Sequence, residues 1–168
     1  MTEINTLHDL FIDQLRDLYS AEQQIANNAF PRAIDNAESQ ELVDTLRSLL
    51  NEIESHTHRI ENIFQELGHL PQGENCEATE GLVTEVEEAI NNIADPSLRD
   101  VALIAQAQRI AHYKISGYGS ACALAGNLGL EAIQQQLHET LEDKKRADNQ
   151  LNNIALDNVN ERAQQHAA

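Results

Sequence analysis

Charged side chains that interrupt apolar helical stripes are the residues of this sequence best placed to do chemistry. Residues three, four or seven positions apart share one face of an α-helix. By that rule Glu22 lies on the same face as Leu15 and Ile25. His56 interrupts an apolar stripe in a later segment, and Glu52, one turn earlier, shares its face. Two helical segments therefore carry ionisable groups on their expected inner faces.

Two lysines occupy similar positions in the second half of the chain. Lys144 lies three residues after Leu141 on an apolar stripe, and Asp148 is one turn further along it. Lys114 stands beside the stripe position of Ala111. A single lysine at such a place has an ordinary explanation, because its long side chain can reach the edge of a bundle. Four segments that each carry an ionisable residue at a similar depth require another explanation.

The cost of burial limits what these groups can do. Burying an unpaired charge costs several kcal/mol, so an inward ionisable group needs a partner. The groups must therefore form ion pairs with each other or coordinate a metal ion. Their positions alone leave both possibilities open.

Five segments carry the 3.6-residue apolar period that predicts amphipathic helices. We expect them at residues 6–28, 39–67, 79–92, 96–127 and 130–159. Pro31 should kink or end the first, and Ser39 is a suitable N-cap for the second. Two helical hairpins joined by a long connection give an all-α, ferritin-like four-helix bundle whose crossover connection contains a short fifth helix. Residues 1–160 form this single domain, and residues 161–168 form a polar tail.

Composition argues against several classes of partner. The 168 residues include 28 Asp and Glu against 11 Lys and Arg, a formal net charge of −17. A chain this acidic repels phosphate backbones and anionic lipids, so we expect no nucleic-acid or membrane partner. We find no apolar run long enough to span a membrane and no secretory signal. Cys76 and Cys122 form no CxxC pair, which favours a reducing compartment and a cytoplasmic protein.

Several motifs relate the chain to a known family. They are YSAEQQ, HY-I--YG, TLE---AD--L and the helix that follows CEATEGL. In these motifs the chain resembles the YciE/YciF family of ferritin-like, stress-associated bacterial proteins, over about residues 7–155. The resemblance implies a four-helix bundle, a homodimer and a di-iron or di-manganese carboxylate centre.

The first half of the chain keeps the acidic positions that the resemblance implies for such a centre. Glu22 and Glu52 are the acids of the first and second helices. His56 stands where relatives have Gln. On the fourth helix Asp148 is also retained.

The third and fourth helices depart from the family pattern. Relatives read EHYE where this chain reads AHYK, so Ala111 and Lys114 stand in place of two carboxylates. Relatives read EEK where this chain reads DKK, so Asp143 keeps an acid but the stripe position is Lys144. Two ammonium groups would repel a cation placed between them, and a protonated lysine is a poor ligand.

These substitutions favour a centre held together by its own charges. We predict a salt-bridge network in place of the metals. Its bases are Lys114 and Lys144, and its acids are Glu22, Glu52 and Asp148. Any remaining metal site would be vestigial or weak and would use Glu22, Glu52, His56 and Asp148.

The sequence therefore favours a ferritin-like stress-associated protein without catalytic residues or a resident cofactor. The alternative is an active di-iron or di-manganese oxidoreductase that acts on peroxide or oxygen. No protein partner is indicated beyond the second copy that the resemblance implies. Among the remaining polar residues, His112 and Tyr118 are expected to be hydrogen-bonded core residues.

Overall fold

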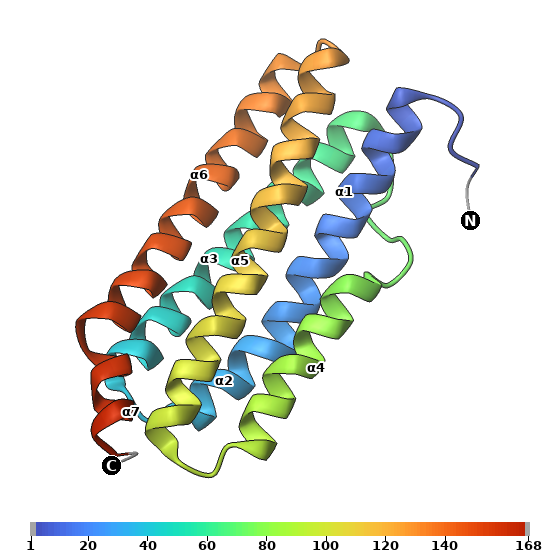
Figure 1. Ribbon diagram of the computed structural model, residues 1–168. Coiled ribbons are helices and arrows are strands. Elements are labelled where there is room, and N and C mark those ends of the chain that lie inside the picture. Colours follow the sequence, from blue (N-terminus) through green and yellow to red (C-terminus); the bar gives the residue numbers. More distant parts are fainter. Residues whose placement is uncertain (1–2, 167–168) are drawn as a thin grey trace.

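Long amphipathic helices dominate the fold and run side by side as a four-helix bundle (Figure 1). The computed structural model describes residues 3–166. The elements are α1 (Leu7–Gln24), a π-helical turn η1 (Ile25–Ala29), α2 (Phe30–Asn36), α3 (Gln40–Leu67), α4 (Glu77–Asn92), α5 (Pro96–Asn127), α6 (Glu131–Ile154), a second π-helical turn η2 (Ala155–Val159) and α7 (Asn160–His166). Gly68 and Gly129, each with a φ of 71°, follow the ends of α3 and α5. Glycine adopts this left-handed conformation without steric cost, so both helices end there.

The first bundle helix continues past the position where the sequence predicted a kink or an end. After α1, the widened turn η1 is followed directly by α2, in whose first turn Pro31 lies. Phe30 N–H donates to the carbonyl of Ile25 at the end of η1. The missing N–H group of Pro31 is accommodated there because it lies directly after the widened turn, in the first turn of α2. Pro31 therefore coincides with a local change of helix type, not with the end of the helix.

The connection between the two hairpins carries the expected fifth helix. α4 lies against α1, η1, α2 and α5, on one side of the bundle (Figure 1). Its N-terminal end is held by Cys76, whose backbone N–H donates to Ser20 Oγ at 3.0 Å. The Cys76 thiol also lies 3.0 Å from the Tyr113 hydroxyl, which donates to Asp17 at 2.6 Å. The architecture is the all-α bundle with a long crossover connection that the helical periods predicted.

The apolar core is divided into two clusters. One contains Ile25, Ile53 and Ile110. The other contains Leu18 and Ile60. Between these clusters lies a set of buried polar side chains, here called the polar layer, which consists of Glu22, His56, Lys114 and Lys144. The bundle therefore positions these four ionisable groups at one level, with apolar packing above and below.

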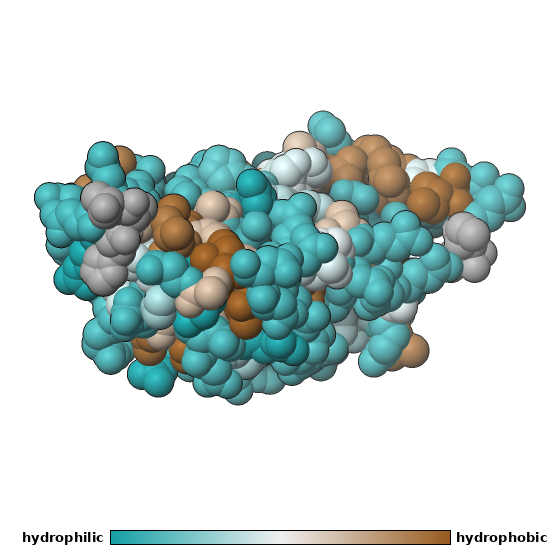
Figure 2. All heavy atoms as spheres, turned by 60° about the horizontal axis from the view of Figure 1, so that its bottom comes forward, coloured by the Kyte–Doolittle hydropathy of each residue, from teal (hydrophilic) through white to brown (hydrophobic). Residues whose placement is uncertain are grey.

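The outer surface is mainly hydrophilic. In the view of Figure 2, hydrophobic side chains gather in separate patches on a polar background. The segment expected to be a polar tail is helical as far as His166, and Ala163 is buried within it. Residues 167–168 lie outside the described part of the chain. Within residues 3–166 no helix has both the length and the apolar character needed to cross a membrane.

The turn between α2 and α3 depends on a carboxylate supplied by α5. Ser39 is the N-cap residue of α3, as expected, but its side chain makes no capping hydrogen bond. Instead, the buried carboxylate of Asp100 accepts from the backbone N–H of Glu38 at 2.9 Å and from that of Ser39 at 2.7 Å. This contact ties the turn of the first hairpin to the start of the second.

Asp100→Ala is expected to lower the free energy of unfolding by about 2 kcal/mol, because two backbone donors lose a charged acceptor. Urea denaturation followed by circular dichroism measures this change. Asp35→Ala is the matched control, because Asp35 is exposed, and it should change stability by less than about 0.5 kcal/mol. Equal losses in the two variants would contradict a capping role for Asp100.

Candidate functional site

The carboxylate of Glu22 is the centre of the polar layer. Its side chain is 0% exposed. Lys114 Nζ donates to Oε2 at 2.6 Å. Lys144 Nζ lies 3.0 Å from Oε1, which also accepts from the Tyr118 hydroxyl at 2.9 Å. The predicted ion pairs of both lysines with Glu22 are present, and Tyr118 is a hydrogen-bonded core residue as expected.

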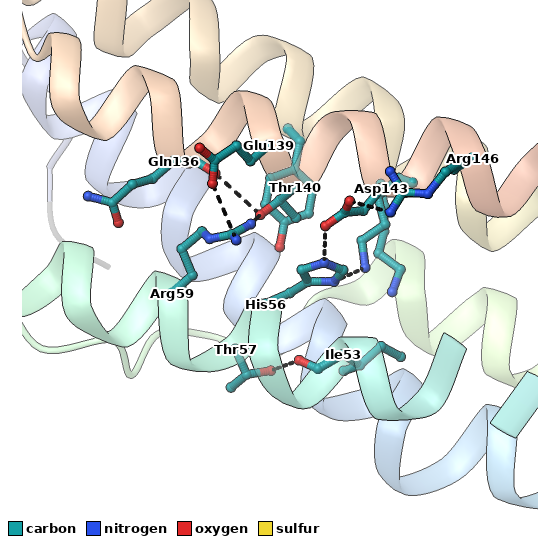
Figure 3. A network of polar contacts seen from close by, with 12 residues as sticks. Ile53, His56, Thr57, Arg59, Gln136, Glu139, Thr140, Asp143 and Arg146 are labelled. Atoms are coloured by element: carbon teal, nitrogen blue, oxygen red, sulfur yellow. Dashed lines mark hydrogen bonds and ion pairs between the residues drawn. The ribbon is translucent and has the colours of Figure 1, made fainter. Parts of the chain in front are cut away.

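His56 extends the polar layer from Lys144 towards the surface (Figure 3). Lys144 Nζ lies 2.6 Å from His56 Nδ1, so the ammonium donates and Nδ1 accepts. The other ring nitrogen, Nε2, lies 2.9 Å from Asp143 Oδ2. These two partners assign the neutral tautomer with its proton on Nε2, which donates to the carboxylate. Asp143 in turn accepts from Arg146 Nη2 at 2.6 Å at the edge of the bundle.

Burial and the neighbouring charges set the protonation of these groups. Burial alone would raise the pKa of Glu22, but Lys114 and Lys144 outweigh it and lower that pKa to about 2. Burial lowers the pKa of Lys114 to about 7, against the attraction of Glu22. Burial and the adjacent Lys144 lower the pKa of His56 to about 4. Glu22 is therefore ionised and His56 neutral at neutral pH.

A cavity of about 20 Å³ lies beside the polar layer. It is lined by both lysines, by Glu52 and by small or apolar side chains that include Ala111 and Ala147. A space of this size holds one water molecule, for which the lysines and Glu52 offer polar partners. The side chain of Ala111 is only a methyl group, so it leaves part of this space unfilled.

Glu52 and Asp148 do not join the ion pairs, contrary to the predicted network. Glu52 is only half-buried, and no described residue forms an ion pair with it. Burial and the nearby Asp143 raise the pKa of Glu52. Asp148 lies at the edge of α6, where its Oδ2 is 3.0 Å from His112 Nε2. His112 is 67% exposed, so its expected place in the core is also wrong.

The structure adds one partner that sequence reasoning missed. Asp143 was noted only as an acid one residue away from the apolar stripe, yet it is the hydrogen-bond acceptor of His56. One residue on a helix turns the side chain by about 100°, which moves it from the inner face to an edge. An acid at such an edge, next to an inward lysine, is the signal that could have found this contact.

The described residues do not fit a di-metal carboxylate centre. Such a centre needs about four carboxylates together with one or two histidines or bridging groups. Here both oxygens of Glu22 and both ring nitrogens of His56 already have partners, and Ala111 offers no donor. Across residues 3–166, no group of three or more His, Cys, Asp or Glu side chains is placed to hold a metal ion. Instead, both lysines form ion pairs with Glu22. Lys144 is also linked to the carboxylate of Asp143 through the ring of His56.

Comparisons with known proteins agree over nearly the whole chain. Residues 6–164 match a family described as a domain of unknown function, DUF892. Protein YciF from Escherichia coli K12 is 34% identical over 165 residues, which cover 98% of this chain and 99% of YciF. The crystal structure of that stress protein superposes with a TM-score of 0.89 at 35% identity and covers 94% of this chain and 99% of its own. YcfI from Rhodopseudomonas palustris, described as a "putative structural protein", superposes with a TM-score of 0.88 at 39% identity. The match covers 92% of this chain and 98% of YcfI.

Proposed function

The chain belongs to the DUF892 family of YciF-type stress proteins. On that premise we propose that ion pairs between buried side chains, not metal ions, link the helices at the centre of the bundle. In this proposal the di-metal site expected of a ferritin-like relative is degenerate. Lys114 and Lys144 replace the metal ions as the cations that bridge the helices. The protein then acts as a structural or interaction partner under stress, not as an oxidoreductase.

The observation that carries the proposal is the pair of lysines on one buried carboxylate. Lys114 and Lys144 lie 2.6 and 3.0 Å from the two oxygens of Glu22. A divalent ion would have to displace both ammonium groups and would then be repelled by them. The position of Ala111 supports the same conclusion, because a cavity lies there in place of a ligand side chain. A homodimer and a cytoplasmic location are part of the proposal and follow from the family resemblance and the reducing character of the composition.

Metal content after loading with Fe²⁺ or Mn²⁺ tests the proposal. After desalting, the unmodified protein is expected to retain well under one ion per chain at its centre. The triple variant Ala111→Glu, Lys114→Glu, Lys144→Glu restores three carboxylates on α5 and α6 and should retain about two ions. Elemental analysis of both proteins, with helicity checked by circular dichroism, gives the comparison.

A matched control separates the position of the charges from their number. In the variant Ala111→Glu, Lys114→Glu, Lys145→Glu the third change falls on exposed Lys145, so the net charge is the same but Lys144 remains in the layer. It should retain less metal than the first variant. Two ions per chain in the unmodified protein would refute the proposal. A folded first variant that retains none would show that the lysines are not what excludes the metal.

A further inference from the structure

Two histidines from distant parts of the chain meet at one end of the bundle. His8 is in the first turn of α1, and His69 follows Gly68 at the end of α3. Their ring centroids are 5.6 Å apart, with an angle of 43° between the ring planes. Figure 1 shows the start of α1 and the end of α3 at the same end of the molecule. We propose that His8 and His69 form a surface site for one divalent transition-metal ion of the zinc class.

The separation of the rings suits a shared ion. Zinc binds imidazole nitrogen at about 2.0–2.1 Å, so two imidazoles on a tetrahedral ion have centroids about 5 Å apart. The observed 5.6 Å is within reach of that value by a small rotation of either side chain. Apolar packing gives the two rings little reason to meet, because His69 is exposed and His8 is only half-buried.

The backbone holds both residues in place. The Thr6 hydroxyl accepts from the backbone N–H of Asp9 at 3.0 Å, and Asp9 accepts from that of Thr6 at 2.9 Å. On the other side, His69 N–H donates to the carbonyl of Phe64 at 2.9 Å. The next residue, Leu70, accepts from Arg16 Nε at 3.4 Å, which fastens this loop to α1. Because both backbone segments are already fixed, metal binding would cost little further conformational entropy.

The ring nitrogens of this pair are free to bind, in contrast to those of His56, His58 and His112. No described residue forms a hydrogen bond or ion pair with His8 or His69. His56 has both nitrogens engaged. His58 is paired with Glu61, and His112 with Asp148.

Only two protein ligands are present, which decides the class of ion and the strength of binding. No third His, Cys, Asp or Glu among the described residues joins the pair, so water fills the remaining positions. Imidazole favours Zn²⁺, Ni²⁺ and Cu²⁺ over the oxygen-preferring Mg²⁺ and Ca²⁺. The net charge of −17 raises the local concentration of cations. The expected site is reversible, and when filled it joins the start of α1 to the α3–α4 connection.

Isothermal titration of the tag-free, full-length protein with ZnCl₂ at pH 7.5 tests the site. One Zn²⁺ per chain should bind, and His8→Ala and His69→Ala should each weaken binding at least tenfold. His138→Ala is the matched control, because His138 is exposed and lies outside the pair, and it should bind as the unmodified protein does.

Several outcomes would overturn the site. They are an unchanged affinity in either alanine variant, a stoichiometry of one Zn²⁺ for two chains, or equal binding of Mg²⁺. The test is independent of the proposed function. Metal that remained in the His8→Ala, His69→Ala double variant but was lost in Glu22→Gln would place an ion at the bundle centre and would contradict the proposed function instead.

Discussion

Glu22→Gln is expected to lower the free energy of unfolding by about 3–5 kcal/mol. The substitution keeps the shape of the side chain and removes its charge. Lys114 and Lys144 would then lie in the core without the carboxylate that both of them pair with, since both ion pairs of the layer converge on this one residue. Urea denaturation at pH 7, followed by circular dichroism, measures the loss.

Two comparison variants show whether the loss comes from unpaired lysines. Glu142→Gln makes the same chemical change at an exposed carboxylate, which pairs with Lys145 on the surface, and should cost far less stability than Glu22→Gln. In the triple variant Glu22→Gln, Lys114→Met, Lys144→Met the buried cations are gone, so most of the lost stability should return. A triple variant as unstable as Glu22→Gln alone would show that shape, not charge, determines the effect.

Acidification should destabilise the protein through His56. Its folded-state pKa is about 4, below the ordinary value of 6.5. Between these values the unfolded chain binds a proton that the folded protein does not, so the stabilisation is complete above pH 6.5 and is lost as pH falls towards 4. Physically, a protonated His56 would face the ammonium of Lys144, 2.6 Å from its Nδ1. From pH 7 to pH 4 this term lowers the free energy of unfolding by about 3 kcal/mol.

The variant His56→Gln isolates this contribution. Glutamine can accept from Lys144 and donate to Asp143 but cannot be protonated in this range. The unmodified protein should therefore lose about 3 kcal/mol more than His56→Gln between pH 7 and pH 4. Titratable groups distant from His56 are common to both proteins and cancel in the difference. His58→Gln is the control at an exposed histidine, and its pH profile should follow that of the unmodified protein. Parallel curves for His56→Gln and the unmodified protein would contradict the assignment.

Sequence periodicity was a good guide to the helices because burial of one face determines where they run. The expected spans 39–67 and 96–127 correspond closely to α3 and α5. The first helix was predicted less well, since Pro31 is an ordinary stop signal and its tolerance depends on a widened turn just before it. A π-helical turn has no clear local signature in sequence.

The centre of the site was predictable and its periphery was not. Glu22, Lys114 and Lys144 lie on or beside apolar stripes, so their burial, and with it their need for partners, could be inferred from spacing. Glu52 and Asp148 share a face with inward residues at a distance of one turn, yet they lie at helix edges. Which edge meets which neighbour depends on the packing of α3, α5 and α6, and a stripe on one helix does not determine that packing.

The polar layer also has a consequence for the order of folding. Glu22 and Lys114 are 92 positions apart, and His56 and Lys144 are 88 apart, so helices from both hairpins must dock before the layer can form. Removing its charges from water costs free energy that only the completed ion pairs offset. The layer is therefore a poor folding nucleus. Interactions that form after the transition state slow unfolding more than they accelerate folding. We therefore expect the buried charges to determine how long the native state lasts, and the apolar clusters on either side to determine how fast it forms.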